Sequence, residues 1–226
     1  MVVRSPSDTR PRYTTCVRLL YLGLPLGAIV LARAGFRPDI AVIGHPEAPG
    51  MRRVRAMGKK GTLVLARPDL GAPDVLRALA SAKPDVIVSF FFPKKISKSV
   101  LDLAPRGAFG AHPSLLPRYR GPDPYFWCLK NGDAVTGVTL HRLEEDYDTG
   151  AIIETREVAI PAGITAFALA RRLDRPALAM LVSCMQRLEA GETLDGAPQP
   201  TRGISYAPSP SEDDTWIDWH ASAEVV

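Results

Sequence analysis

The segment from Asp85 to Phe92, Asp-Val-Ile-Val-Ser-Phe-Phe-Phe, constrains the fold most strongly. It is nearly all apolar, which is typical of a strand buried on both faces of a parallel sheet. Three shorter apolar runs precede it, at residues 16–21, 40–43 and 63–65. Glycine- and proline-rich turns or helical patterns separate these runs, so the chain predicts an α/β fold built on a Rossmann-like, doubly wound, mostly parallel sheet.

A late antiparallel pair is predicted at residues 135–143 and 151–160, because these two apolar runs flank a short acidic loop. Helices are predicted from the turn at 23–27 to about Gly35 and over residues 72–82, 96–103, 123–129 and 165–188. Pro176 is expected to kink or split the last of these.

Three regions are expected along the chain. Residues 1–12 are polar and are expected to be disordered, and residues 13–190 form one α/β domain. Residues 191–226 form a C-terminal extension rich in Pro, Ser and acidic residues, in which Trp216 and Trp219 are expected to dock an otherwise extended chain. The extension is also interpreted as the start of a further domain that is missing or truncated.

Composition excludes several classes of protein. The length of 226 residues and the 46% hydrophobic content suit a soluble globular protein, and a net charge of +4 does not by itself indicate nucleic-acid binding. Three cysteines without metal-ligand spacing predict no metal site and suit a reducing cytoplasm.

Residues 12–34 imitate a signal peptide, since basic residues precede an apolar run. The alternative, which we prefer, is a strand, a Gly-x-Pro-x-Gly turn and a helix, because Gly23 and Pro25 would break a continuous apolar helix. No run approaches the roughly 20 apolar residues of a membrane span, so neither a membrane partner nor export is expected.

The stretch from Gly110 to Gly121 carries the candidate chemistry. Residues 107–109 are interpreted as the end of a buried strand, and the two prolines and the closing glycine that follow predict a rigid loop. A doubly wound sheet places chemistry at the carboxyl ends of its strands, which makes His112 a candidate. The alternative is a surface turn with a solvated histidine.

A second loop, from Glu144 to Gly150, carries Asp148. An imidazole near a carboxylate suits proton transfer, because the carboxylate fixes the tautomer and stabilises the imidazolium. Spacing along the chain does not by itself pair His112 with Asp148.

Three blocks in order carry a family resemblance: His-Pro-Ser-Leu-Leu-Pro-Arg-Tyr-Arg-Gly at 112–121, Thr-Gly-Val-Thr at 136–139 and Asp-Thr-Gly at 148–150. They resemble the 10-formyltetrahydrofolate-dependent formyltransferases, which include methionyl-tRNA formyltransferase, glycinamide ribonucleotide transformylase and the amino-sugar N-formyltransferases. The resemblance covers roughly residues 15–190, and residues 205–208 and 217–219 resemble the segment that follows the catalytic domain in the tRNA and sugar enzymes.

The resemblance implies that a primary amine attacks the formyl carbon of N10-formyltetrahydrofolate, with no metal. It places His112 as a donor to the formyl oxygen, and Asp148 as the group that orients His112 and a proton-relaying water. The implied folate-binding residues are Phe90, Phe91, Phe92, Ser114, Leu115, Leu116, Pro117, Glu145, Asp146 and Tyr147. The implied acceptor-binding residues are His45, Arg118, Tyr119 and Arg120. For the three phenylalanines, plain core packing is the alternative.

One position departs from the family, which has the pattern Asn-x-His plus Asp. Gly110 stands where the family has the asparagine, and Asn131 is the only asparagine of the chain. Losing one oxyanion donor lowers a rate by about 10²–10³. Three interpretations stay open: another donor or a water fills the space, the smaller residue admits a different acyl donor or acceptor, or the protein binds folate or an amine without catalysis.

The acceptor is predicted to be a small amine such as an amino sugar. Residues 51–60 hold five cations and are interpreted either as a tRNA-gripping loop or as a solvated basic helix. They lack the aromatics that stack on bases, and Val226 leaves no room for the tRNA enzymes' second domain, although a truncated chain would explain that as well. Transfer to tRNA-borne amines is therefore the alternative, and the oligomeric state is not predicted.

Overall fold

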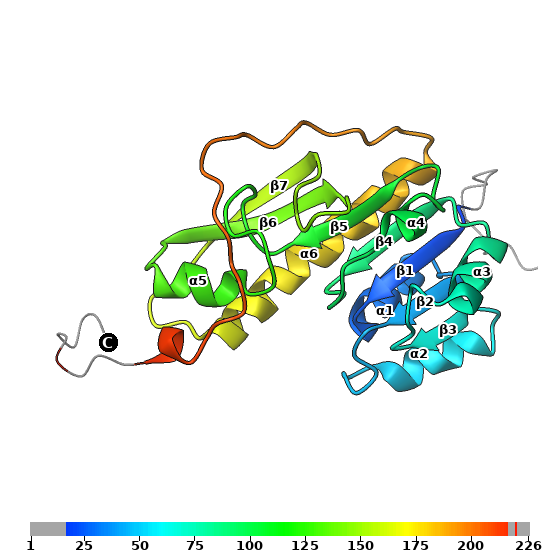
Figure 1. Ribbon diagram of the computed structural model, residues 1–226, viewed down its shortest axis with the longest axis horizontal. Helices are drawn as coiled ribbons and strands as arrows, with labels where there is room; N and C mark the ends of the chain where they lie inside the picture. The colour runs from blue at the N-terminus through cyan, green and yellow to red at the C-terminus, as the bar shows by residue number, and fades with distance from the viewer. Residues whose placement is uncertain (1–16, 217–219, 221–226) are drawn as a thin grey trace, which may run out of the picture.

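The computed structural model describes residues 17–216 and 220, which form a sheet of seven strands in the order β3-β2-β1-β4-β5-β6-β7 (Figure 1). The strands are β1 (Leu19–Gly23), β2 (Ile40–Ile43), β3 (Leu63–Ala66), β4 (Val86–Phe90), β5 (Ala108–His112), β6 (Val135–Arg142) and β7 (Ile152–Ala159). The first five are parallel, β6 is antiparallel to β5, and β7 is antiparallel to β6. This confirms the doubly wound, mostly parallel sheet with a late antiparallel pair.

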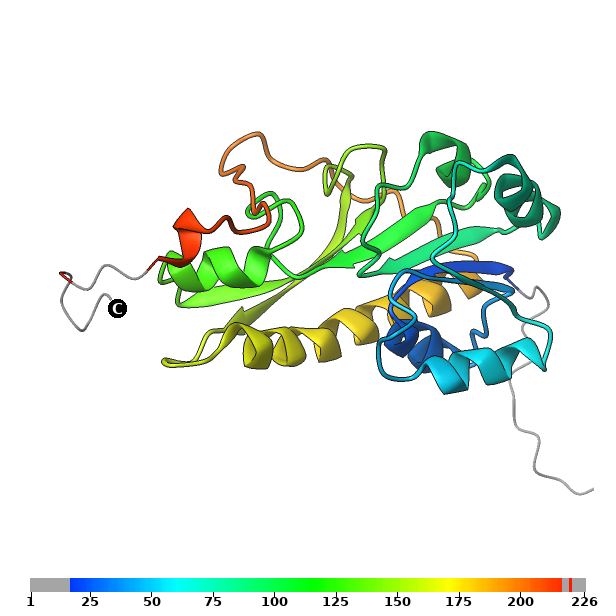
Figure 2. The ribbon, with the colours of Figure 1, turned by 60° about the horizontal axis from the view of Figure 1, so that its bottom comes forward.

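Helices cover both faces of the sheet. They are α1 (Pro25–Arg33), α2 (Met51–Gly58), α3 (Pro73–Ser81), α4 (Lys98–Leu101), α5 (Pro124–Lys130) and α6 (Ala166–Glu189), and a 3-10 turn, η1, spans Asp213–Thr215. Helices α1, α2 and α6 lie on one face, and α3 and α4 on the other (Figure 2). The short α5 packs against α6.

The apolar strands contribute to two cores because successive side chains point to opposite faces. In β1, Leu19 and Tyr21 pack in the core under α1, α2 and α6, whereas Leu20 and Leu22 pack in the core under α3 and α4. Buried on both faces, such a strand cannot alternate apolar with polar residues. This explains why the apolar runs of the parallel strands are continuous.

The structure corrects the prediction for the β5 region. The strand does not end at Phe109 but continues to His112, so Gly110 and His112 belong to the strand. The reason is the antiparallel neighbour β6, in which His141 pairs with Gly110 and Thr139 pairs with His112. A partner strand satisfies the backbone groups that a loop would have left to solvent.

Pro176 does not split the last helix, because α6 runs without interruption across it. A proline removes one backbone hydrogen bond, and buried side chains on both sides of it, such as Leu173 and Leu181, keep the helix packed on the sheet. The strand predicted to reach Phe92 ends at Phe90, since Phe91 has a φ of 53°.

Predictions for the chain ends differ in outcome. Trp216 is 79% exposed, so it does not dock the extension as predicted. Trp219 and residues 1–12 lie outside the described residues. The domain boundaries stay a prediction. In the described part of the chain, none of the helices combines the length and the apolar character that crossing a membrane requires.

The basic segment at 51–60 contains a helix, in line with one of its two interpretations. Met51 and Val54 of α2 are buried, while Arg52, Arg53 and Arg55 are exposed. Its cations therefore lie on the solvent side of an amphipathic helix.

Candidate active site

A cavity of about 710 Å³ lies at the carboxyl ends of the parallel strands. Most of its wall comes from three segments: residues 91–96 after β4, residues 110–113 at the end of β5 and residues 143–148 after β6. Leu24 and His45 add the loops that follow β1 and β2. The crossover order of the sheet brings these loops to one edge, which is where α/β sheets bind ligands.

His112 is the last residue of β5 and is 7% exposed. Its Nε2 lies 2.7 Å from the carbonyl oxygen of Tyr119, and its Nδ1 lies 3.5 Å from Oδ1 of Asp148. A carbonyl only accepts, so Nε2 carries a hydrogen and donates it to Tyr119. The atom free to act toward the cavity is therefore Nδ1.

Asp148 is held at both its side chain and its backbone. Its Oδ2 accepts a hydrogen bond from the backbone N–H of Gly121 at 2.9 Å, and its carbonyl accepts from Nε2 of Gln199 at 2.7 Å. Asp148 has a left-handed φ of 57°, which costs a non-glycine residue free energy that surrounding contacts must offset. At Gly150 a β-carbon would overlap the carbonyl oxygen of Arg142, so this turn requires glycine.

A second imidazole faces the same carboxylate. His141, on β6, is 2% exposed, and its Nε2 lies 3.6 Å from Oδ1 of Asp148. Its Nδ1 lies 2.7 Å from the carbonyl oxygen of Arg142. Burial lowers the pKa of His141 from 6.5 to about 4, although the charge of Asp148 opposes this. The ring is therefore neutral at pH 7.

The space beside Gly110 is already occupied. A β-carbon added at Gly110 would lie 2.7 Å from Cδ2 of Leu143 and 3.6 Å from Nε2 of His141. The first contact is closer than carbon atoms approach without displacement. Leu143 therefore lies beside Gly110 with the end of a flexible side chain, and the three interpretations of this glycine stay predictions.

The structure brings five of the ten residues predicted for folate binding to the cavity. Phe91, Phe92, Glu145, Asp146 and Tyr147 line it, together with Gly110, His112 and Asp148, and so does His45, which is predicted for the acceptor. Phe90 does not reach it, because its side chain is fully buried in the core of β4. Phe90 follows the core-packing alternative alone, whereas Phe91 and Phe92 are half-buried, pack against the cores and also line the cavity.

The loop that follows β5 packs behind the cavity rather than lining it. Ser114 is fully buried, and its Oγ donates to the carbonyl oxygen of Arg118. The amide of Leu116 donates to Oγ1 of Thr139. Ser114, Leu115, Leu116 and Pro117 therefore do not form the predicted cavity wall, because these contacts fold the loop back against β6.

The side chains of residues 118–120 make contacts that fix the loop in place. Arg118 forms an ion pair with Asp133 at 2.8 Å, and the hydroxyl of Tyr119 donates to the same carboxylate. The guanidinium of Arg120 donates to Oε1 of Gln199. None of these three side chains lines the cavity, so the structure does not place them where the predicted acceptor contact requires.

Several cavity residues were not predicted from the sequence. They include Leu24, Lys94, Lys95, His141, Leu143 and Glu144. A signal existed for His141, since it stands alone as a polar ring in an apolar strand, seven residues before Asp148. Recognising it required the knowledge that β6 pairs with β5.

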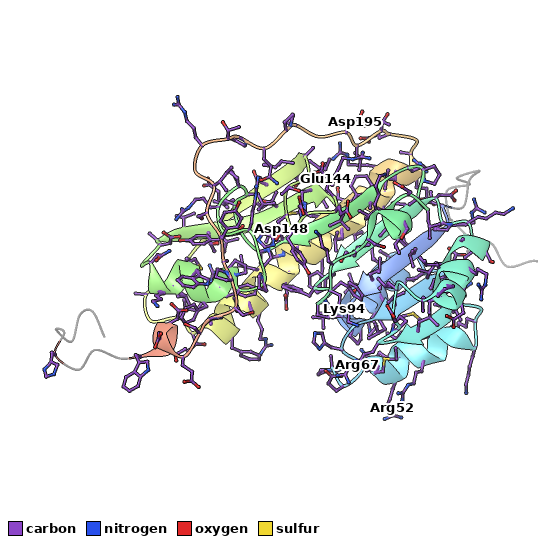
Figure 3. The ribbon with its side chains drawn as sticks, in the orientation of Figure 1. Arg52, Arg67, Lys94, Glu144, Asp148 and Asp195 are labelled. Atoms are coloured by element: carbon purple, nitrogen blue, oxygen red, sulfur yellow. The ribbon has the colours of Figure 1, made fainter. Side chains whose placement is uncertain are left out.

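The two sides of the cavity carry opposite charges. Figure 3 shows Glu144 and Asp148 on the side of the antiparallel strands, with Lys94, Arg67 and Arg52 on the side of β2 and β3. Lys95 bridges the two sides through a 3.0 Å ion pair with Asp146. Among residues 17–216 and 220, no group of three or more His, Cys, Asp or Glu side chains is arranged to hold a metal ion.

The C-terminal segment 191–211 passes over the loops that carry these residues, as the orange ribbon in Figure 1 shows. Ala197 pairs with Ile152 at the start of β7. Further along, Oγ of Ser205 accepts from the amide of Tyr119, and the amide of Ala207 donates to the carbonyl oxygen of Arg120. One segment thus connects the loop that follows His112 with the β6–β7 loop.

Comparisons with known proteins agree with this architecture. A family model described as formyl transferase matches residues 38–185. Glycinamide ribonucleotide transformylase 1 from Symbiobacterium toebii is similar in structure, with a TM-score of 0.68 at 21% identity over 82% of this chain and 93% of that chain. A sugar N-formyltransferase from Shewanella sp FDAARGOS_354 has a TM-score of 0.64 at 15% identity, over 86% of this chain and 78% of that one.

HypX from Aquifex aeolicus, in a complex with tetrahydrofolic acid, has a TM-score of 0.67 at 19% identity. The match covers 94% of this chain but only 33% of HypX. At these identities the similarity to the solved structures concerns the fold.

Proposed function

Because this chain belongs to the formyl transferase family, we propose that it transfers a formyl group from N10-formyltetrahydrofolate to the primary amine of a small molecule, such as an amino sugar. The observation that carries the proposal is the buried His112–Asp148 pair at the wall of the cavity, with 3.5 Å between Nδ1 and Oδ1. Oxyanion stabilisation and proton movement are what formyl transfer to an amine requires.

His112 is suited to stabilise the developing oxyanion. Its Nε2 donates to Tyr119, so a protonated ring presents Nδ1–H toward Asp148 and the cavity. When the amine attacks the formyl carbon, negative charge develops on the formyl oxygen, and a positioned N–H stabilises it. Asp148 lies beside this nitrogen and is itself fixed by the amide of Gly121.

The residues around the cavity fit a folate. Phe91, Phe92 and Leu143 supply apolar surface for a flat pterin ring, and the loop at 144–148 supplies polar groups for its edge. The volume of about 710 Å³ lies within the range of small-molecule sites, roughly 300–1,000 Å³. HypX, of which 33% is matched by this chain, forms a complex with tetrahydrofolic acid, which supports this donor.

A small acceptor is supported by the composition of the wall and by two neighbours. The glycinamide ribonucleotide and sugar enzymes of similar fold are named for small-molecule acceptors. His45 lines the cavity on the side opposite the acidic loop, where an acceptor could enter. The exposed arginines of α2 do not line the cavity, so they offer no contact to an amine bound in it.

The test is formyl transfer by the purified protein. N10-formyltetrahydrofolate is mixed with an amino-sugar nucleotide, other small primary amines or methionyl-tRNA, and both tetrahydrofolate and the formamide are measured by mass spectrometry. We expect turnover with a small amine, and a loss of about 10²–10⁴-fold in His112→Ala, the range of a positioned proton donor.

Other results would contradict the proposal in different ways. If folate binds but no amine is formylated, the protein is a folate-binding protein on this scaffold. If tetrahydrofolate does not bind at all, the donor is wrong. Turnover with methionyl-tRNA alone would make the tRNA alternative correct.

A further inference from the structure

The site contains two imidazoles and one carboxylate, and the formyl-transfer mechanism above uses only His112. His112 and His141 approach the same oxygen, Oδ1 of Asp148, at 3.5 and 3.6 Å. Their rings stand edge to face, with centroids 6.4 Å apart. Each ring has its other nitrogen on a backbone carbonyl, Tyr119 for one and Arg142 for the other. Both imidazoles are buried and line the cavity.

The hydrogen bond to Arg142 fixes the tautomer of His141. A carbonyl oxygen accepts only, so Nδ1 of His141 carries the hydrogen, at a distance of 2.7 Å. In the neutral ring the lone pair is then on Nε2, the atom 3.6 Å from Asp148. His141 lines the cavity, so this lone pair is within the site.

The surroundings of His141 keep the ring neutral in the resting protein. Burial is the main cause of its low pKa of about 4, and the positive charges of His112 and Arg120 lower it further. Asp148 and the carbonyl of Arg142 act in the opposite direction, so a proton that arrives at Nε2 has a negative partner. A neutral base beside a carboxylate can hold a proton briefly and release it.

We propose that His141 is the proton acceptor of this site and that its Nε2 takes the proton from the attacking amine. The inference rests on the proposed formyl transfer. His112 would stabilise the oxyanion, and the two tasks would fall on two rings that share one carboxylate.

The proton balance of the step closes without another reactant. The amine nitrogen forms a bond to the formyl carbon, and the C=O electron pair moves to oxygen near His112. One N–H proton of the resulting ammonium passes to Nε2 of His141. As the carbonyl re-forms and the bond from carbon to N10 breaks, His141 returns that proton to N10. The products are a formamide and tetrahydrofolate, and both rings are restored.

Gly110 has a place in this arrangement. It is the cross-strand partner of His141, and side chains of such pairs lie next to each other on one face of a sheet. A β-carbon at Gly110 would lie 3.6 Å from Nε2 of His141, so a longer side chain there would stand against the atom that takes the proton. Cδ2 of Leu143, 2.7 Å from the same β-carbon position, occupies this side instead.

The first experiment measures tautomers and titration directly, without activity. The chain has four histidines, so their ring nitrogens can be assigned by ¹⁵N NMR with variants in which one histidine at a time is replaced. We expect His141 to be the Nδ1–H tautomer and to stay neutral well below the pH at which an ordinary histidine titrates. An Nε2–H tautomer, or titration at the ordinary value, would overturn the proposal even if formyl transfer is confirmed.

The second experiment separates a proton acceptor from a structural histidine. His141→Asn can still donate an amide hydrogen to Arg142 but has no base at the position of Nε2. We expect kcat to fall by about 10²–10⁴-fold, with the affinity for tetrahydrofolate unchanged. The matched control is His220→Gln, at an exposed position outside the cavity, which should keep wild-type kcat.

The outcomes distinguish this inference from the function on which it depends. If the wild type formylates an amine and His141→Asn does so equally fast, His141 is structural and the inference is wrong. If His141→Asn fails to fold, His141→Ala with added imidazole replaces it, because the short side chain leaves space for the ring, and rescue of kcat by imidazole is the expected result. Absence of rescue in a folded variant counts against the proposal. If the wild type formylates no amine, the proposed function fails first.

Discussion

At the scale of single residues, the candidate site contains a buried imidazole, that of His141, which is neutral at pH 7. His141 is 2% exposed and its pKa is lowered to about 4. An unfolded histidine titrates near 6.5, so between these two values the unfolded chain binds more protons than the folded one. Stability then rises with pH across this window and is lost as the pH falls from about 6.5 toward 4.

We therefore expect acid to destabilise the wild type more than His141→Asn. Between about pH 7 and pH 4.5 the free energy of unfolding should fall by roughly 2–3 kcal/mol more in the wild type than in the variant, since one pKa unit corresponds to about 1.4 kcal/mol. Urea unfolding at both pH values measures it. Equal losses in the two proteins would show that folding does not lower the pKa of His141.

Gly110 gives a second prediction at this scale. In Gly110→Ala the new β-carbon would lie 2.7 Å from Cδ2 of Leu143, the end of a flexible side chain that has to shift, so we expect a loss of about 1 kcal/mol, the low end of overpacking. Truncating the neighbour should relieve it, so Gly110→Ala should cost much less in a Leu143→Ala background. A double-mutant cycle by thermal or urea unfolding measures this coupling. Additive effects would mean that Leu143 does not fill this space.

At the scale of elements, the segment 191–211 matters because it connects two loops that carry the site. Gln199 alone donates to the carbonyl oxygens of Asp148 and Gly150 and accepts from Arg120. The backbone of Asp148 has a left-handed φ, which costs free energy. The hydrogen bonds from Gln199 offset this cost and hold the loop in that conformation. The side chain positions Asp148 without touching the cavity.

Replacing Gln199 by Leu removes these bonds and leaves two carbonyl groups unpaired. We expect a loss of about 1–3 kcal/mol in stability, the cost of an unsatisfied buried polar group, and a lower kcat because Asp148 is less well fixed. Gln199→Glu keeps the acceptor for Arg120 but not the donor, so its activity should stay low. Gln186→Leu, at an exposed position of α6, is the control. A wild-type kcat in Gln199→Leu would show that the β6–β7 loop positions Asp148 without Gln199.

At the scale of the whole molecule, charge divides the protein into two sides around the cavity (Figure 3). The antiparallel side contributes Glu144, Glu145, Asp146 and Asp148 to the wall, and the opposite side contributes Lys94, Lys95 and His45. The arginines of α2 lie farther out, on an exposed helix face. Exposed charges beyond a screening length of about 8 Å have little effect on a bound neutral group at physiological salt.

Reversing the charges on the exposed face of α2 distinguishes a small-amine acceptor from a tRNA acceptor. We expect the triple variant Arg52→Glu, Arg53→Glu and Arg55→Glu to keep kcat/KM for a small amine, because none of these side chains lines the cavity. For a tRNA acceptor the same change would remove phosphate contacts and lower kcat/KM steeply at low salt. Steady-state kinetics at two salt concentrations distinguishes these results. A loss with the small amine would place α2 within the acceptor site.

Much of the fold could be predicted because its pattern is local. The strand at Ile40–Ile43 has the predicted bounds, and the others differ by a few residues at their ends. Apolar runs buried on both faces, separated by helices with one apolar side, leave few alternatives to a doubly wound sheet. The prediction failed where a neighbour in space decided the conformation, as at Gly110 and His112, which the pairing with β6 keeps in a strand.

The sequence by itself indicated the family, the sheet and the two segments that carry His112 and Asp148, because order and spacing along the chain encode them. Only the tertiary structure decided that these side chains meet, that Leu143 fills the space beside Gly110 and that His141 joins them. Those relations depend on which strands pair and in which register, and a one-residue shift would turn His141 to the opposite face. Tautomer and burial follow from that register, and the chemistry open to His141 depends on both.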